Sequence, residues 1–394
     1  MSLKIKEMAY AMEDWLIENR RHFHRHPEPS MEEVWTTNEI VKILEGWGIE
    51  VKRFDNCPGC LAFVRGAHPG KTVALRSDID ALQVFEKNDI DYKSEFEGLM
   101  HACGHDTHLT MNLGAAKILH DLRDELHGTV IHIFQPAEEI AEGAKATLVD
   151  DSWFEDVDNV FGMHIWTNLD SGKISVEAGP RMAAADYFKV DIEGVSGHGA
   201  QPEQTVDATL VAAHMISNFQ PLVSREVSPT DSLVVTVGRV VSGTRFNIIS
   251  GSATLEGTVR YFTPELNKSI ESMMQRIVEH SAKMYRARAT LDYRFYTYPV
   301  INEEKSSAHA EKVVTKLFGE EALQTYERTT GGEDFSEYLK RKPGCFAFLG
   351  CRNPEVLADK PHHSDYFMVD EAVFKDGAAL YAQYAYDFLN EGLD

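Results

Sequence analysis

The residues best suited to chemistry lie between Met100 and His108, where the sequence reads Met-His-Ala-Cys-Gly-His-Asp-Thr-His. This short segment contains three histidines, a cysteine and an aspartate. Such side chains cost free energy when they are desolvated, and binding a divalent metal ion is the circumstance that makes them favourable. Cys103 and His105 are two residues apart, so on an extended backbone both side chains would point to the same side. The segment therefore predicts half of a metal site.

Polar side chains also follow three apolar runs that predict buried strands: Thr72–Leu75, Thr129–Phe134 and Asn159–Ile165. The side chains at the carboxyl ends of these runs are Asp78 and Asp80, Glu138 and Glu139, and His164. In open α/β sheets, ligands bind beyond the carboxyl ends of the strands. We therefore expect these residues to gather with the cysteine and histidines of the first segment.

The two ends of the chain alternate between helical and strand patterns, whereas the middle has a different character. Helical spacing covers Ile5–Arg25 and Thr107–Leu126, and Cys345–Leu349 predicts a further buried strand. The middle predicts three strands and two helices, at Tyr187–Ile192, Ser232–Val241, Ala253–Phe262, Thr205–Phe219 and Pro264–Tyr285. The fold class is therefore α/β, with a discontinuous catalytic domain (1–185 and 298–394) and an inserted α+β domain (186–297).

Composition narrows the class of protein further. A chain of 394 residues exceeds the usual size of one hydrophobic core, which predicts two domains. The net charge of −23 argues against a general affinity for nucleic acid or anionic membranes. Five unevenly spaced cysteines do not form a disulfide framework, and residues 1–15 lack the apolar core of a signal peptide. We therefore expect a cytoplasmic protein with no nucleic-acid or membrane partner.

Several segments together resemble the M20 metallopeptidase superfamily, and within it the amidohydrolase branch of hippurate hydrolases and plant auxin-conjugate hydrolases. The segments that carry the resemblance are Arg25–Glu28, Leu75–Leu82, Met100–His108, Phe134–Glu139, His164, Gly197–His198, Gly257–Arg260, Gly332–Phe335 and His363. The resemblance implies a metal-dependent exopeptidase-like catalytic domain, with a mixed sheet flanked by helices. It also implies two divalent metal ions and a smaller lid domain through which the protein forms a homodimer or tetramer.

The resemblance assigns metal ligands and a general base. It makes Cys103 a bridging ligand, and the remaining ligands are His105, Glu139, His164 and His363. Such donors suit zinc, manganese, cobalt or nickel better than calcium or magnesium. Glu138 would act as general base toward a metal-activated water, and Asp80 would orient a metal-bound imidazole. Asp78, His101 and His108 lie near this set without an assigned role.

The implied reaction is hydrolysis of the amide bond of an N-acyl amino acid or a short peptide. In related enzymes a histidine at the position of His198 reaches the substrate carbonyl from the partner subunit. Asn247 and Arg260 are candidates for binding the substrate carboxylate, since a guanidinium binds that group through two hydrogen bonds. Each has a plainer structural alternative: a histidine in a glycine turn, a loop asparagine and a strand charge.

Two alternatives stand beside this reading. His26 and Glu28, followed by Cys57 and Cys60, resemble the ligand pattern of zinc nucleobase deaminases. The cysteine pair could equally be a redox motif or two buried thiols. The chain could also be a binding protein that has lost catalysis. For Glu138 and Glu139 the structural alternative is a solvated acidic pair at the start of a helix.

Overall fold

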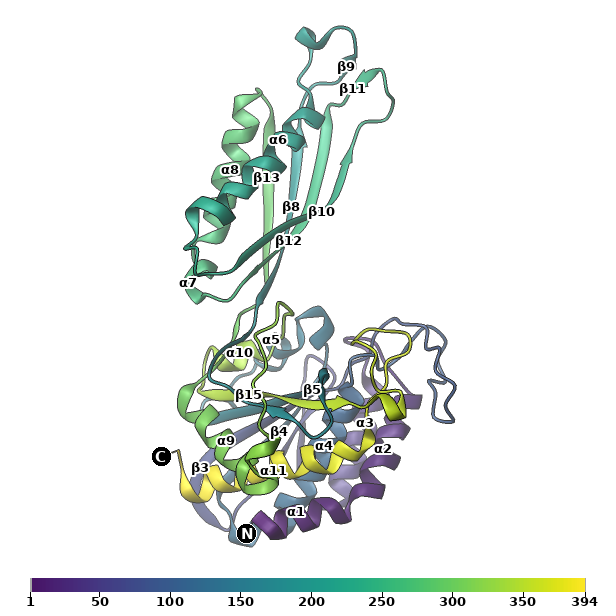
Figure 1. Cartoon of the computed structure of the whole chain (residues 1–394), viewed down its shortest axis with the longest axis vertical. Coiled ribbons are helices and arrows are strands. Elements are labelled where there is room, and N and C mark those ends of the chain that lie inside the picture. Colours follow the sequence, from purple (N-terminus) through teal and green to yellow (C-terminus); the bar gives the residue numbers. More distant parts are fainter. Residues whose placement is uncertain (1, 394) are drawn as a thin grey trace. The chain divides into compact units, whose positions relative to one another are not determined.

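The computed structural model describes residues 2–393, which divide by their contacts into two units (Figure 1). The first unit contains the residues up to Arg181, Ile301–Glu327 and those from Asp334 onward. The second unit contains Met182–Val300 and Arg328–Glu333. Two connecting strands, β7 (Gly179–Met182) and β14 (Val300–Asn302), lie where the chain passes between the units. The assignment of the units as catalytic domain and lid remains a prediction.

The first unit is built on a mixed seven-stranded sheet with the order β1-β2-β4-β3-β5-β15-β6. Its strands are β1 (Glu50–Arg53), β2 (Cys60–Arg65), β3 (His68–Asp78), β4 (His127–Gln135), β5 (Asn159–Asp170), β6 (Ile174–Ser175) and β15 (Gly344–Arg352). The central strands β4, β3, β5 and β15 run parallel, and the pairs toward both edges are antiparallel. The carboxyl ends of the central strands therefore meet at one edge of the sheet.

Helices cover both faces of this sheet (Figure 1). They are α1 (Ser2–Ala11), α2 (Glu13–Arg25), α3 (Val34–Gly46), α4 (His105–Asp121), α5 (Gly143–Thr147), α9 (Glu304–Phe318), α10 (Ser336–Leu339) and α11 (Phe374–Glu391). α4 and α11 pack against each other and against β3, and both are buried along most of their length. α5 and α10 lie on the opposite side of the sheet (Figure 1). The interior position of α4 fixes where its first turn meets the strand ends.

The second unit has its own core, between an antiparallel sheet and three helices. The sheet has the order β10-β12-β8-β13, with β8 (Ala184–Glu193), β10 (Leu233–Ser242), β12 (Ser252–Tyr261) and β13 (Arg288–Thr297). The helices are α6 (Ala208–Pro221), the short α7 (Pro264–Asn267) and α8 (Ile270–Met284). A two-stranded pair, β9 (Gly197–His198) with β11 (Ile248–Ile249), completes the unit. The fold class predicted from the sequence, a mixed α/β sheet flanked by helices plus a smaller α+β unit, is confirmed.

Three local predictions differ from the structure. The helix predicted over Ile5–Arg25 is two helices, because Met12 leaves the helical conformation between α1 and α2. The helix Pro264–Tyr285 is likewise divided into α7 and α8. His164 lies inside β5 rather than at its end, because pairing with β15 carries the strand on to Asp170. None of the helices within residues 2–393 combines the length and apolar character needed to cross a bilayer.

Asp186 on β8 is a buried carboxyl group in the core region of the second unit. Burial raises the pKa of Asp186 to about 6, although the Tyr293 hydroxyl donates a hydrogen bond of 2.8 Å to it. The folded state therefore retains a proton that the unfolded state releases. Because the folded state binds more protons in this range, stability falls as the pH rises from about 4 to about 6.

We expect Asp186→Asn to remove this loss of stability. Relative to the parent protein, the free energy of unfolding of the variant should rise between pH 4 and pH 7, by at most about 3 kcal/mol for two pKa units. Urea unfolding at several pH values measures this difference. Asp191→Asn, at a half-exposed position on the same strand whose pKa is lowered by Lys189, is the control and should not reproduce the rise. A pH-independent difference for Asp186→Asn would contradict the prediction.

Candidate metal centre

A left-handed glycine brings Cys103 and His105 together. Gly104 has a φ of 92° and precedes the first residue of α4, which is His105. A Cβ at this glycine would lie 2.5 Å from Cγ2 of Ile165, so a larger residue would be excluded by both strain and space. The two ligand side chains do converge, but the expected extended backbone between them is wrong. The turn into the helix is what brings them together.

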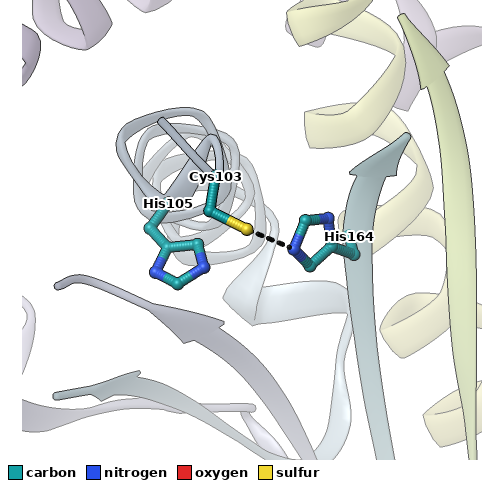
Figure 2. A group of neighbouring side chains, drawn as sticks. All are labelled: Cys103, His105 and His164. Atoms are coloured by element: carbon teal, nitrogen blue, oxygen red, sulfur yellow. Dashed lines mark hydrogen bonds between the residues drawn. The ribbon is translucent and has the colours of Figure 1, made fainter. Parts of the chain in front are cut away.

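Two groups of potential metal donors share Cys103. One contains Cys103, His105 and His164, and the other contains Cys103, Glu139 and His363. Within each group the donor atoms lie within 4.8 Å of one another. Figure 2 shows the first group, in which the Cys103 sulfur lies 3.4 Å from Nε2 of His164. In the second group, Nε2 of His363 lies 3.5 Å from a carboxylate oxygen of Glu139. A thiolate at Cys103 could therefore bridge two ions.

The donor atoms have the properties that a cation would satisfy. Nε2 of His105 and Oε1 of Glu139 are buried without a hydrogen-bond partner among the described residues. Burial and the carboxylates of Glu139 and Glu138 raise the pKa of Cys103 well above its usual value. Burial lowers the pKa of His164 well below its usual value, which favours a neutral, ligating imidazole. These residues fit two divalent ions of the kind that accept sulfur, nitrogen and oxygen donors.

Asp80 forms hydrogen bonds with a residue of each donor group. Nδ1 of His105 donates a hydrogen bond of 3.0 Å to Asp80, which leaves Nε2 to face the other donors. The second carboxylate oxygen of Asp80 accepts hydrogen bonds from the Ser30 hydroxyl and from the backbone N–H of Glu139. Burial raises the pKa of Asp80, but hydrogen bonds from His105 and Ser30 outweigh it and lower that pKa overall. One buried carboxylate thus orients an imidazole and holds the loop that carries Glu139.

The loop after β4 presents its two glutamates in a 3₁₀ turn, Glu138–Ile140, and not in an α-helix. Ala137, just before the turn, has a left-handed conformation with a φ of 54°. Its N–H donates a hydrogen bond of 2.7 Å to the buried carboxyl group of Glu33. Both glutamates are only partly exposed, and Oε2 of Glu138 lies 4.0 Å from Nε2 of His105. The solvated acidic pair at a helix start is therefore not what the structure contains.

His362 and His363 are adjacent but have different hydrogen-bonding environments. His363 adopts a left-handed backbone with a φ of 66°, and its side chain reaches Glu139. His362 is directed toward Trp166 and Phe367, and its Nε2 accepts a hydrogen bond from the N–H of Thr167. That bond commits one ring nitrogen of His362 to the backbone. Nδ1 of His362 lies 4.0 Å from the sulfur of Cys103, but of these two histidines only His363 belongs to a donor group with Cys103. His363 therefore remains the predicted ligand of this pair.

Asp78 and His108, whose roles the sequence left open, bond to each other. Asp78 also accepts a hydrogen bond of 2.7 Å from the guanidinium of Arg76, so both of its oxygens are engaged. Arg76 contacts Gln135 and Asp334 as well, across a separation of 258 residues in the latter case. Sequence reasoning missed Arg76 and Gln135 as site residues, although both lie within recognised motifs.

The remaining candidates lie in the second unit. His198 pairs with Ile248 between β9 and β11, and its Nδ1 accepts a hydrogen bond from the N–H of Ala200. Asn247 is next to this pair, and its carbonyl accepts the N–H of Gly199. Arg260 lies on β12, is half-buried, and is close enough to Asp186 for the two charges to interact. Their roles toward substrate remain predictions.

The deaminase-like residues do not form a site. Glu28 caps the start of α3 by accepting the N–H groups of Trp35 and Thr36, and His26 stacks on Trp35. Within residues 2–393, no group of metal donors includes these two residues or the cysteine pair. Burial raises the pKa of Cys57 and of Cys60 to about 12, which disfavours the thiolate that metal binding and redox chemistry require. This alternative is therefore not supported.

The match to known families agrees with the geometry. Peptidase family M20/M25/M40 matches residues 74–387, which include every donor of the two groups. The chain belongs to this family. The resemblance found in the sequence is thereby confirmed.

Individual M20 proteins are similar over nearly the whole chain. Thermostable carboxypeptidase 2 of Saccharolobus solfataricus is 36% identical, covering 98% of this chain and 99% of that protein. N-acetylcysteine deacetylase of Bacillus subtilis is 37% identical, covering 91% and 93%. The crystal structure of the Bacillus subtilis protein YXEP, a dinuclear metal binding peptidase from the M20 family, has a TM-score of 0.84 at 34% identity and covers 96% and 99%.

Because Cys103 belongs to both donor groups, replacing different predicted ligands of this M20 protein should leave different numbers of bound ions. We expect Cys103→Ala to lose both ions, because its sulfur belongs to both groups. His164→Ala and His363→Ala should each lose one ion and keep the other tightly bound. Titration of metal-free protein with zinc, followed by elemental analysis, measures the stoichiometry. His362→Gln is the matched control and should retain two ions. Two tightly bound ions in Cys103→Ala would show that the sulfur does not bridge.

Proposed function

We propose that this M20 protein is a metal-dependent amidohydrolase that cleaves the amide bond of N-acyl amino acids or short peptides. The observation that carries the proposal is the pair of donor groups that share Cys103. This arrangement would hold two ions side by side at the carboxyl ends of the central strands. Relatives named as a carboxypeptidase and a deacetylase support a substrate in which an amino acid is released from an amide.

When bound, two divalent ions would polarise the amide carbonyl and lower the pKa of a water molecule. The residues of the chain provide the remaining steps. Asp80 orients His105 through Nδ1, and Glu139 and His363 complete the second group. Glu138 belongs to neither group that contains Cys103, yet its carboxylate lies beside both. We therefore assign Glu138 to take the proton from water and deliver it to the leaving amine.

Residues of the second unit would recognise the rest of the substrate. Arg260 and Asn247 are the candidates for binding the carboxylate of the released amino acid, because a guanidinium and an amide both donate to it. His198 is the candidate for a hydrogen bond to the carbonyl oxygen as charge develops there. The second unit would act as lid and as the dimerisation surface of a homodimer or tetramer. We place this activity in the cytoplasm, with zinc, manganese, cobalt or nickel as the ion.

A panel of N-acyl amino acids and dipeptides tests the proposal directly. Metal-free protein is assayed after addition of zinc, manganese, cobalt or nickel, and release of the free amino acid is measured. We expect hydrolysis of at least one class of substrate with at least one metal, and none without metal. Absence of hydrolysis with all four metals would reject the enzymatic function, because the donor set suits each of these ions.

Glu138→Gln should separate proton transfer from metal binding. We expect kcat to fall about 10²–10⁴-fold, because the amide cannot accept the proton, while both ions remain bound. Steady-state kinetics and elemental analysis measure the two effects. Glu142→Gln is the matched control, since Glu142 lies in the same loop and its carboxylate makes an exposed ion pair with Lys145. Equal losses in the two variants would remove Glu138 from the mechanism.

A further inference from the structure

His108 belongs to neither donor group that contains Cys103, and it forms a third group of potential donors with Asp78 and His105. Both of its ring nitrogens, however, are already engaged within the protein. Nδ1 lies 2.6 Å from Asp78, and Nε2 accepts a hydrogen bond of 2.8 Å from the backbone N–H of Ile165. Arg76 holds the other oxygen of Asp78, which keeps that group a carboxylate and therefore an acceptor. The proton of His108 must then be on Nδ1, which leaves Nε2 as the acceptor that Ile165 requires. His108, Asp78 and Arg76 are all at least 99% buried.

The N–H of Ile165 needs this acceptor because of the sheet register. β3 pairs with β5 only as far as Gly162, where Arg76 is its last partner. Beyond Gly162, β5 continues to pair with β15 on its other side. The N–H of Ile165 would be a buried, unsatisfied donor without His108, which is costly in a protein interior. The imidazole thus supplies the acceptor at a point where β5 no longer pairs with β3.

The backbone carbonyl of Ile165 also accepts a hydrogen bond from an imidazole. Nδ1 of His164 donates a hydrogen bond of 2.5 Å to the carbonyl of Ile165. That bond leaves Nε2 of His164 facing the sulfur of Cys103 at 3.4 Å. The backbone of Ile165 therefore lies between two imidazoles, one of which is fixed by Asp78 while the other is a proposed metal ligand. A shift of this backbone would turn the donor nitrogen of His164 away from Cys103.

We propose that His108 is a positioning residue that fixes the backbone of Ile165 and thereby aims Nε2 of His164 at the metal centre. The inference rests on the proposed function, because it needs His164 as a ligand. Asp78 then serves to set the tautomer of His108 and is not itself a ligand. Outer partners of this kind commonly change metal affinity by about 10–100-fold when they are removed.

Two substitutions of His108 test the contributions of its two ring nitrogens separately. The amide oxygen of His108→Gln reaches toward the position of Nε2 and can accept from Ile165. The shorter His108→Asn places its amide near Nδ1, where it can donate to Asp78 but leaves the N–H of Ile165 without an acceptor. We expect His108→Asn to weaken zinc at the group containing His164 by about 10–100-fold, and His108→Gln to restore most of that affinity. The ion held with Glu139 and His363 should change less in both.

Zinc titration of metal-free protein in competition with a chelating dye measures the two affinities, and thermal unfolding is followed in parallel. His132→Asn is the control, since it also removes a fully buried imidazole but lies in neither donor group. It should lower the melting temperature without changing zinc affinity. Nitrogen NMR of histidine-labelled parent protein provides a test without substitution: we expect the neutral Nδ1–H tautomer for His108, and an Nε2–H tautomer would overturn the inference.

The outcomes separate the inference from the proposed function. Two ions bound by the parent protein without hydrolysis of any substrate would reject the amidohydrolase activity but leave the role of His108 standing. Equal zinc affinities in His108→Asn and His108→Gln would overturn the positioning role while leaving the activity in place. A parent protein that binds none of zinc, manganese, cobalt and nickel would overturn both.

Discussion

Two buried aspartate–histidine pairs join the first turn of α4 to the end of β3, and the site depends on them. His105 and His108 are three residues apart on the helix, so their side chains lie on the same face. Asp78 is the last residue of β3, and Asp80 follows two residues after the strand has ended. His108 bonds to Asp78 and His105 bonds to Asp80. The helix start and the segment that ends β3 thus meet in one place, where four polar side chains are buried and each has a partner.

The two pairs serve different purposes although their chemistry is the same. The Asp80–His105 pair leaves Nε2 of the imidazole without a partner and directed into the donor cluster. The Asp78–His108 pair uses the second imidazole nitrogen for the backbone of β5. One pair therefore presents a predicted ligand, His105, and the other would fix the strand from which the next predicted ligand, His164, projects. Arg76 compensates the additional buried carboxylate of Asp78, which would otherwise stand beside Asp80 without a counter-charge.

The types and positions of the potential metal donors could be predicted from the sequence, but the contacts that orient these side chains could not. The density of cysteine and histidine around Gly104 and the acidic pair after β4 carry a local signal. The left-handed conformation at Ala137 carries none, because alanine rarely adopts a positive φ and does so here only through contacts made in the folded chain. His101 and His108 illustrate the limit. Both are buried, yet His101 has no hydrogen bond from either ring nitrogen among the described residues, whereas His108 has two. Their places in the motif do not distinguish them, since the partners are supplied by β3 and β5.

The same buried charges that orient the ligands also set their proton affinities. Burial alone would lower the pKa of His105, but the carboxylates of Asp78, Asp80 and Glu139 raise it to about 10. Burial and neighbouring carboxylates also hold the proton on the thiol of Cys103. At neutral pH the metal-free cluster therefore carries protons on groups that must be deprotonated in order to ligate. A divalent cation would replace these protons, and the carboxylates that held them would then stabilise the cation. The excess of buried carboxylates, which would destabilise an ordinary protein core, would thus favour the exchange of protons for metal.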